Sequence, residues 1–123
     1  MLSPDGSAPA NKGQFASERD ALTAVVDRLV RAIEPSAIWL FGSRARGDAR
    51  PESDFDLLVV VRPGVKVDGG SYYDIYDPVR GMGLGLDVVP CSYEDFEEGR
   101  SEPHTMVAQI VKEGRLLYEA RPN

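Results

Sequence analysis

The sequence has a single cysteine, Cys91, and no long hydrophobic run. One cysteine excludes an internal disulfide and fits a reducing cytoplasm. No apolar segment approaches the roughly 20 residues that a membrane-spanning helix needs. The first residues, 1–15, also lack the basic start and apolar stretch of a secretory signal. We therefore expect a cytoplasmic protein that does not associate with membranes.

Lysine is scarce as well: three lysines and eleven arginines face 20 acidic residues, which gives a formal net charge of −6. A surface that binds DNA or RNA through phosphates usually has clustered basic residues in excess of acids. Here the arginines are scattered, apart from Arg44, Arg46 and Arg50. The composition therefore argues against broad nucleic-acid binding and favours a basic protein partner or a metal–nucleotide complex.

A length of 123 residues accommodates one domain. Residues 1–14 are rich in small and polar side chains, so we predict a disordered tail followed by a single domain over residues 15–120. A helix is predicted from Ser17, which has the spacing of an N-terminal cap with Asp20, to Pro35. Its apolar positions recur at intervals of three and four residues, at Leu22, Val25, Val26, Leu29, Val30 and Ile33.

The remaining chain alternates between strands and helices. Short apolar runs predict strands over residues 37–41, 54–61, 84–89 and 115–118, the third ending at Pro90. Further helices are predicted over residues 71–82, over the acidic segment that follows Ser92, and from Pro103 to Gly114, with His104 in the first turn of the last. The order of elements predicts an α/β fold of the α+β type, in which helices flank a small mixed sheet.

Two acids, Asp54 and Asp56, open the second predicted strand. Side chains two residues apart on a strand project from the same face, with Cα atoms about 6.6–7 Å apart. Leu58 continues this face, so the carboxylates lie together where the chain enters the strand. Two converging carboxylates can bind one or two divalent cations, and such paired ions clamp an in-line phosphoryl displacement. The alternative interpretation is a solvated edge strand with ordinary surface acids.

A Gly-Ser pair, Gly42 and Ser43, directly follows the first predicted strand. Glycine allows the backbone to approach a ligand closely, and N–H groups at a helix start favour phosphate oxygens. Ser43 adds a hydroxyl group, and Arg44 and Arg46 can form charge-assisted hydrogen bonds with a polyphosphate. The segment therefore places candidate nucleotide-binding groups beside candidate metal ligands. For the two arginines, an ordinary role as solvated loop residues is the alternative.

A third carboxylate, Asp87, interrupts the apolar residues 84–89. A charge inside such a run is costly unless it is paired or bound to a metal. If this strand lies beside the strand of Asp54 and Asp56, Asp87 completes an acidic cluster and can accept the proton of an acceptor hydroxyl. The alternative is an acid at a strand end that pairs with an arginine.

These residues together resemble the signature of the DNA polymerase beta nucleotidyltransferase superfamily: Gly-Ser, ten residues, then Asp-x-Asp, between two apolar strands. The short chain is similar to the minimal nucleotidyltransferases (MNT), the antitoxin half of HEPN–MNT toxin–antitoxin pairs. The resemblance implies a polymerase-beta-like fold and a triphosphate held by Gly42 and Ser43. It also implies two Mg²⁺ ions bound by Asp54, Asp56 and Asp87, with Asp87 as the catalytic base.

The same resemblance implies a reaction and a partner. Members of this group transfer AMP from ATP to a tyrosine of the partner HEPN ribonuclease and thereby silence it. We therefore expect a Mg²⁺-dependent protein adenylyltransferase that acts as an antitoxin. Two alternatives remain open: a binding module that neutralises the toxin by occlusion, without chemistry, and a transferase for small molecules such as antibiotics. The choice of nucleotide, the number of units added and the assembly as a homo- or hetero-oligomer remain open too.

Overall fold

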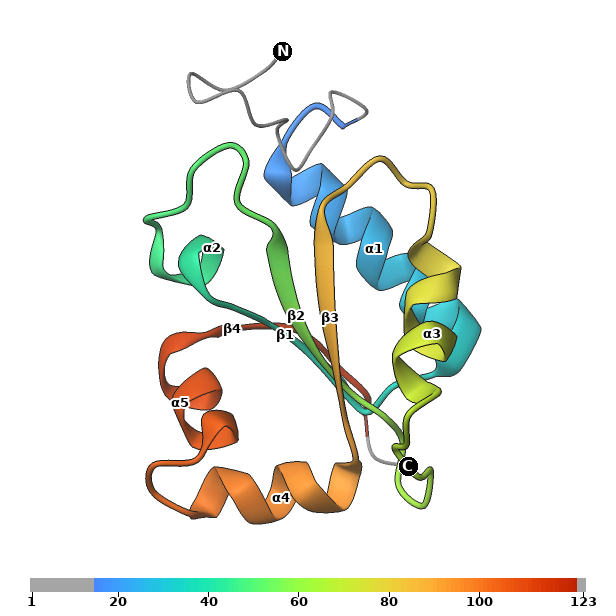
Figure 1. The fold of residues 1–123 in the computed structure, drawn as a ribbon, viewed down its shortest axis with the longest axis vertical. Helices are drawn as coiled ribbons and strands as arrows, with labels where there is room; N and C mark the ends of the chain where they lie inside the picture. Colours follow the sequence, from blue (N-terminus) through green and yellow to red (C-terminus); the bar gives the residue numbers. More distant parts are fainter. Residues whose placement is uncertain (1–14, 122–123) are drawn as a thin grey trace.

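The computed structural model of the chain describes residues 15–121, and its centre is a mixed four-stranded sheet. The strands β3 (Leu86–Cys91), β2 (Phe55–Val60), β1 (Ala37–Phe41) and β4 (Arg115–Glu119) lie side by side in that order (Figure 1). β1 is antiparallel to both β2 and β4, whereas β2 and β3 are parallel. The α+β fold with a small mixed sheet is therefore confirmed, while the tail predicted for residues 1–14 lies outside the described residues.

The first helix, α1 (Glu18–Ile33), has the ends that its sequence predicts. The Asp20 amide donates a hydrogen bond to Ser17 Oγ over 3.1 Å, which satisfies one of the N–H groups that a helix start leaves without an internal acceptor. At the other end, Glu34 adopts a left-handed conformation with φ 48° immediately before Pro35. Proline disfavours the helical conformation in the residue before it, so the helix ends there.

Alternate residues of β2 contribute to two hydrophobic cores, one on each face of the sheet. Leu57 and Val59 pack with α1, α3 (Ser71–Tyr76) and the short 3₁₀ helix η1 (Asp77–Val79). The remaining side chains of the strand face the other way, as the period of two requires.

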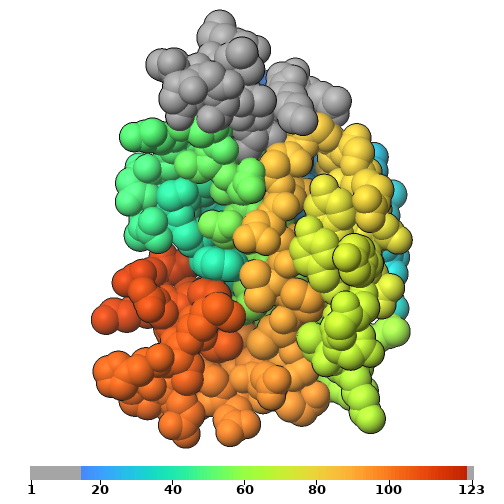
Figure 2. Space-filling view, viewed as in Figure 1, coloured from blue at the N-terminus to red at the C-terminus, as the bar shows by residue number. Residues whose placement is uncertain are grey.

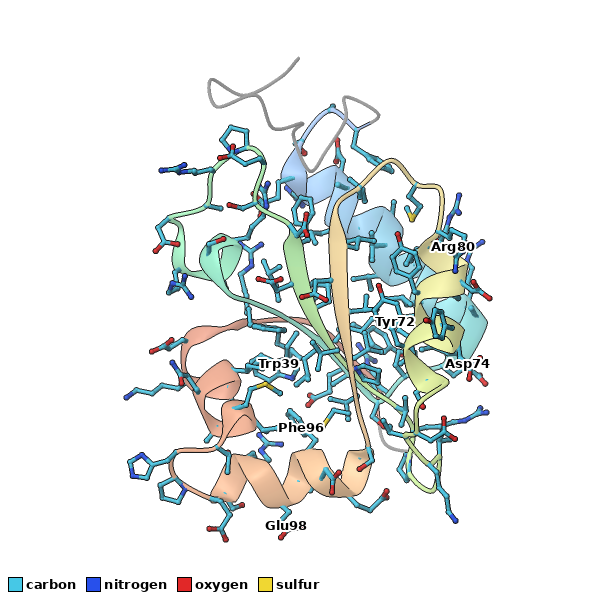
Figure 3. All side chains as sticks on the ribbon, in the orientation of Figure 1. Trp39, Tyr72, Asp74, Arg80, Phe96 and Glu98 are labelled. Carbon is cyan, nitrogen blue, oxygen red and sulfur yellow. The ribbon has the colours of Figure 1, made fainter. Side chains whose placement is uncertain are left out.

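Leu58 and Val60 pack on that second face, against α4 (Tyr93–Ser101) and α5 (Met106–Glu113). Figure 3 shows Trp39 of β1 and Phe96 of α4 within this second core, with ring centroids 6.3 Å apart.

Three predicted elements have at least one wrong boundary. The helix predicted over 71–82 ends at Tyr76 and continues as η1, because Pro78 lacks the N–H that a longer α-helix would use. The third strand starts at Leu86 and passes through Pro90, which a strand at the sheet edge accommodates because one side of its backbone has no strand partner.

The last helix is the third case, because it starts at Met106, later than predicted. Thr105 caps it: the Ala108 amide donates to Thr105 Oγ1 over 3.0 Å. His104 lies before the helix in a left-handed conformation, with φ 71°. Within the described part of the chain, no helix is both long and apolar enough to cross a membrane.

Candidate active site

The parallel pairing of β2 with β3 brings the predicted carboxylates together. Asp56 is the register partner of Asp87, and partners in neighbouring strands project from the same face of a sheet. Asp54 precedes β2 by one residue and Asp56 by two, so it belongs to the same face by alternation. The adjacency that the sequence analysis assumed for Asp87 is therefore observed.

These three acids lie on the face that α4 and α5 cover, at the end of the sheet where β2 begins. Leu58 and Val60 of that face are buried further along the strand, in the core under the two helices. α4 lies at the opposite end of β3, so it leaves the start of β2 uncovered (Figure 1). Asp54 and Asp87 are exposed and Asp56 is half-buried. The burial cost expected for Asp87 does not apply, because its side chain reaches solvent.

The electrostatics of Asp56 show that the three carboxylates interact. Partial burial raises the pKa of Asp56 above its ordinary value of 3.8, and the charges of Asp87 and Asp54 raise it further. Arg46 acts in the opposite direction and lowers the same pKa. A half-buried carboxylate between two others is an unfavourable arrangement for an isolated protein, and a cation beside it would relieve the repulsion.

Gly42 brings the backbone of the Gly-Ser pair against this acidic cluster. Phe41, the last residue of β1, is the register partner of Asp56, so the chain leaves β1 beside that carboxylate. A Cβ atom on Gly42 would overlap Asp56 Oδ2 and lie 3.2 Å from Asp56 Cγ. The glycine also has φ 73° and ψ −157°, a conformation that is essentially restricted to glycine. Both the close approach and the backbone conformation therefore require glycine here.

The short helix α2 (Ser43–Arg46) starts directly after Gly42. The amides of Ala45 and Arg46 both donate to the Gly42 carbonyl over 3.1 Å, which turns the chain into the helix. The first amides of a helix have no acceptor inside it and point outward from its N-terminus. The predicted helix start is thus confirmed, and it directly follows the glycine whose backbone approaches the Asp56 carboxylate.

The two arginines of α2 have different surroundings. Arg46 is exposed, forms an ion pair with Asp48 over 3.4 Å and is close enough to Asp56 to lower its pKa. Arg44 is directed to the loop that leads into β2, where its guanidinium binds main-chain carbonyl groups. The nucleotide-binding role expected for both remains a prediction.

A cavity of about 270 Å³ adjoins Gly42. Its lining combines Phe41, Gly42 and Arg46 with residues of α5 and its C-cap, namely Met106, Gln109, Ile110, Glu113 and Gly114. Figure 2 shows the face of the molecule on which β3, α2 and α5 meet. Nothing in the sequence of α5 indicates that it lines this cavity, because its residues have the pattern of an ordinary amphipathic helix.

The side chains on this face fit a hard divalent cation in their chemistry. Carboxylate oxygens are the ligands that Mg²⁺ prefers, and Mg²⁺ sites typically use only one or two of them together with substrate phosphates. Within residues 15–121, no three acidic, histidine or cysteine side chains are already close enough to enclose an ion. A cation at this position would therefore draw Asp54, Asp56 and Asp87 closer together.

Comparison with known protein families identifies the family of the chain. The family described as polymerase beta, nucleotidyltransferase matches residues 24–123, which include the Gly-Ser pair and the three acids. The chain belongs to this nucleotidyltransferase family. Among curated proteins, none matches the sequence. The family membership and the fold that the sequence predicted are thus confirmed.

Several solved structures contain chains whose fold is similar to that of this nucleotidyltransferase domain. A candidate nucleotidyltransferase from Sulfolobus solfataricus aligns with TM-score 0.57 and 22% identity, over 80% of this chain and 78% of the other. A toxin–antitoxin structure with AMP-PNP aligns with TM-score 0.55 and 22% identity, over 80% and 73% of the chains. A chain from a complex of tri-AMPylated Shewanella oneidensis HEPN toxin with MNT antitoxin aligns with TM-score 0.55 and 18% identity, over 85% and 74%. At these identities the likeness is one of fold.

Proposed function

We propose that this nucleotidyltransferase is a Mg²⁺-dependent protein adenylyltransferase that transfers AMP from ATP to a tyrosine of a HEPN toxin and acts as its antitoxin. The observation that carries the proposal is the position of Asp56. It pairs with Asp87 across β2 and β3, and it also touches the backbone of Gly42. Groups suited to a cation and groups suited to a triphosphate therefore adjoin each other.

Each residue has a distinct part in this reaction. Asp54 and Asp56 would hold the cations, with Asp87 as a further ligand, and bound Mg²⁺ supplies charge neutralisation at the phosphates. The N-terminus of α2 with Gly42 and Ser43 would bind the triphosphate, and Arg46 lies beside them as a second source of positive charge. Because Asp87 is exposed, it is the carboxylate that can face the tyrosine of the partner.

The chemistry is an in-line displacement at the α-phosphorus of ATP. The tyrosine oxygen forms a bond to the α-phosphorus while the bond from that phosphorus to the bridging oxygen breaks, and pyrophosphate leaves. Asp87 accepts the proton that the tyrosine hydroxyl loses. Because Asp87 is exposed, an acceptor on another protein can reach it without rearrangement of the core.

Two observations favour a toxin as the acceptor-bearing partner. Chains of similar fold occur in structures described as a toxin–antitoxin with AMP-PNP and as a tri-AMPylated HEPN toxin with an MNT antitoxin. The net charge of −6 also favours a basic protein partner over nucleic acid. We include a cytoplasmic location in the proposal, since a nucleotide and a ribonuclease partner are both found there.

The proposal is tested with the protein encoded next to this chain. The two purified proteins are incubated with ATP labelled at the α-phosphate and Mg²⁺, and the partner is then weighed by mass spectrometry. We expect label on the partner and a mass gain of one or more adenylyl groups at a tyrosine. A partner that is inhibited but unmodified would contradict the enzyme and would support the occlusion module.

The matched control compares Asp→Asn substitutions in the acidic cluster with an Asp→Asn substitution in α4. The double variant Asp54→Asn, Asp56→Asn removes two carboxylates of the cluster and should abolish transfer. Asp95→Asn removes an exposed carboxylate from the first turn of α4 and should leave transfer unchanged. Full transfer by the double variant would refute the role of the acidic cluster.

A further inference from the structure

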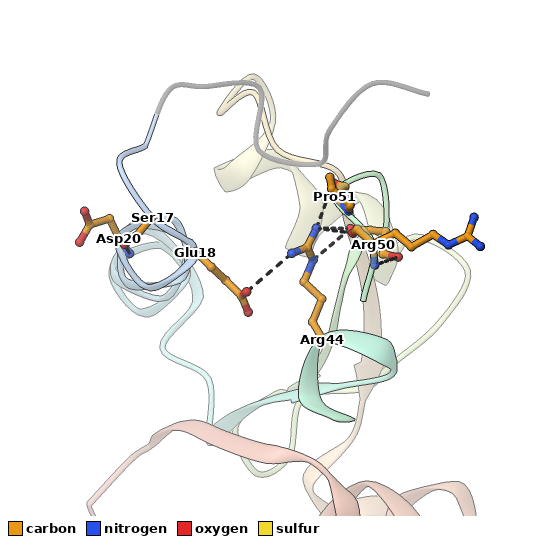
Figure 4. Close-up of polar contacts among 7 residues, drawn as sticks. Ser17, Glu18, Asp20, Arg44, Arg50 and Pro51 are labelled. Carbon is orange, nitrogen blue, oxygen red and sulfur yellow. Dashed lines mark hydrogen bonds and ion pairs between the residues drawn. The ribbon is translucent and has the colours of Figure 1, made fainter. Parts of the chain in front are cut away.

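Arg44 connects α2 to the loop that precedes β2. Its Nε donates to the Ser53 carbonyl over 3.0 Å, and its Nη2 donates to the same oxygen over 2.7 Å. Nη2 also lies 3.2 Å from the Pro51 carbonyl and 3.3 Å from the Arg50 carbonyl (Figure 4). One guanidinium thus binds three carbonyl groups of a single short segment.

Further contacts hold the guanidinium in this position. Its Cζ lies 4.2 Å from the ring centroid of Phe55, a buried residue at the start of β2. On another side, Nη1 lies 3.6 Å from Glu18 Oε2 in the first turn of α1 (Figure 4). Only 11% of the Arg44 side-chain surface is accessible to solvent. A cation so enclosed and so fully bonded is directed away from solvent, and therefore away from an incoming polyphosphate.

The bonded carbonyl of Ser53 has particular importance because it belongs to the peptide group that joins Ser53 to Asp54. Two hydrogen bonds to one carbonyl oxygen fix the orientation of that planar peptide group. They thereby place the N–Cα bond of Asp54 and restrict the directions in which its side chain can leave the backbone. The backbone of Arg44 lies in α2, only two residues after Gly42. Gly42 and Ser43, at the start of this helix, form the proposed triphosphate site, which we call the cradle.

We propose that Arg44 is a positioning residue that sets the place of Asp54 relative to the cradle of Gly42 and Ser43. The proposal rests on the proposed function in so far as it concerns transfer, whereas the ordering of the loop is independent of any activity. It also reassigns Arg44 from the polyphosphate contact that the sequence suggests to a contact within the protein. Arg46 remains the arginine available to phosphate.

The chemistry of arginine explains why this position needs it. The guanidinium is planar and carries five N–H donors in a fixed fork, so Nε and Nη2 can bind one segment while Nη1 faces Glu18. Lysine has one compact ammonium group and cannot reproduce this division of donors. Arg44→Lys therefore retains the positive charge and removes the hydrogen bonds to the loop before β2. The variant thus separates a role in binding phosphate from a role in positioning the loop.

The first test is hydrogen–deuterium exchange of the purified chain, which requires no activity. The amides of Ser53 and Arg50 are internally bonded, the first to the Arg50 carbonyl and the second to Ser53 Oγ, each over 3.0 Å. In Arg44→Lys we expect exchange across residues 48–54 to accelerate by roughly tenfold or more, since bonds to a charged donor hold this loop. The matched control is Arg62→Lys, which alters one exposed ion pair with Glu34 and should leave that loop unchanged.

The second test measures Mn²⁺ affinity from the free-ion signal in electron paramagnetic resonance, with a non-hydrolysable ATP analogue present. Misplacement of Asp54 should weaken Mn²⁺ binding in Arg44→Lys by about fivefold or more, while Arg62→Lys binds as the wild type does. In transfer assays, Arg44→Lys should lower kcat by roughly 10–100-fold with KM for ATP within about threefold. Arg46→Ala should instead raise KM for ATP.

The experiments distinguish a failure of the positioning role of Arg44 from a failure of the proposed function. Unchanged loop exchange in Arg44→Lys would overturn the positioning role, and so would a raised KM for ATP with unchanged kcat and Mn²⁺ affinity. If the wild-type chain transfers no nucleotide to any partner, the proposed function has failed. The exchange and Mn²⁺ measurements would still decide whether Arg44 is a positioning residue or an arginine that faces solvent.

Discussion

Replacement of Gly42 by alanine should damage the site much more than it damages the fold. The added Cβ would overlap Asp56 Oδ2 and lie 3.2 Å from Cγ and 3.4 Å from Cβ of the same side chain. The nearest atom belongs to the end of a side chain, so the Asp56 carboxylate can rotate out of the way. That rotation moves a predicted cation ligand away from Asp87 and from the start of α2.

The magnitude of the stability loss follows from the backbone. Gly42 has φ 73° and ψ −157°, and a side chain in such a conformation costs on the order of 1–3 kcal/mol. For a domain of this size we expect the melting temperature to fall by roughly 3–15 °C. A displacement of about 1 Å at a catalytic group can reduce turnover by about 100-fold, so transfer should fall by that order even where the protein stays folded.

The assay compares two glycine variants by thermal unfolding and by label transfer from ATP. Gly47, at the end of α2, has φ 84°, and a Cβ there would meet nothing within 4 Å. Gly47→Ala therefore has the strain of a left-handed alanine, about 1–2 kcal/mol, without the collision. We expect it to lose stability but to keep transfer within about threefold of the wild type when assayed below its melting temperature.

The comparison can refute the reasoning in two ways. Wild-type transfer by folded Gly42→Ala would show that the approach of the backbone to Asp56 has no catalytic importance. An equal loss of transfer in both variants would show that strain in α2, and not the position of the Asp56 carboxylate, accounts for the defect.

Three further predictions concern charge and helix ends. Burial and the charges of Asp87 and Asp54 raise the pKa of Asp56, so the ionised carboxyl destabilises the folded protein. The stability of the protonated form is fully present below about pH 3.8 and is lost as the pH rises through the raised pKa. Asp56→Asn should therefore melt above the wild type at pH 7 and equal it near pH 3 in calorimetry. Burial and Asp95 raise the pKa of Cys91 from 9.0 to about 11. At pH 8 iodoacetamide should therefore alkylate it about 100-fold more slowly than in the urea-unfolded chain, and equal rates would contradict this. Ser17→Ala removes the cap of α1 and should cost about 1 kcal/mol in urea unfolding, whereas an unchanged midpoint would show that the cap is dispensable.

Much of the fold and part of the site can be read from local sequence. The period of two in β2 assigns Leu57 and Leu58 to opposite faces, and both are buried in separate cores as expected. The cap at Ser17 and the Gly-Ser turn after β1 are equally local, because each depends on residues within one or two turns of chain. Such features were predictable since neighbouring residues alone decide them.

The tertiary structure decided what depends on distant residues. Only the pairing of β2 with β3 places Asp87 beside Asp56, since more than twenty residues of chain separate them and their register is set by the whole sheet. The path of Arg44 to the Ser53 carbonyl and to Glu18 was hidden for the same reason: an arginine after Gly-Ser has the same sequence pattern whether it binds phosphate or protein. The sequence by itself determined which chemical groups this nucleotidyltransferase has, whereas long-range packing determined which of them meet.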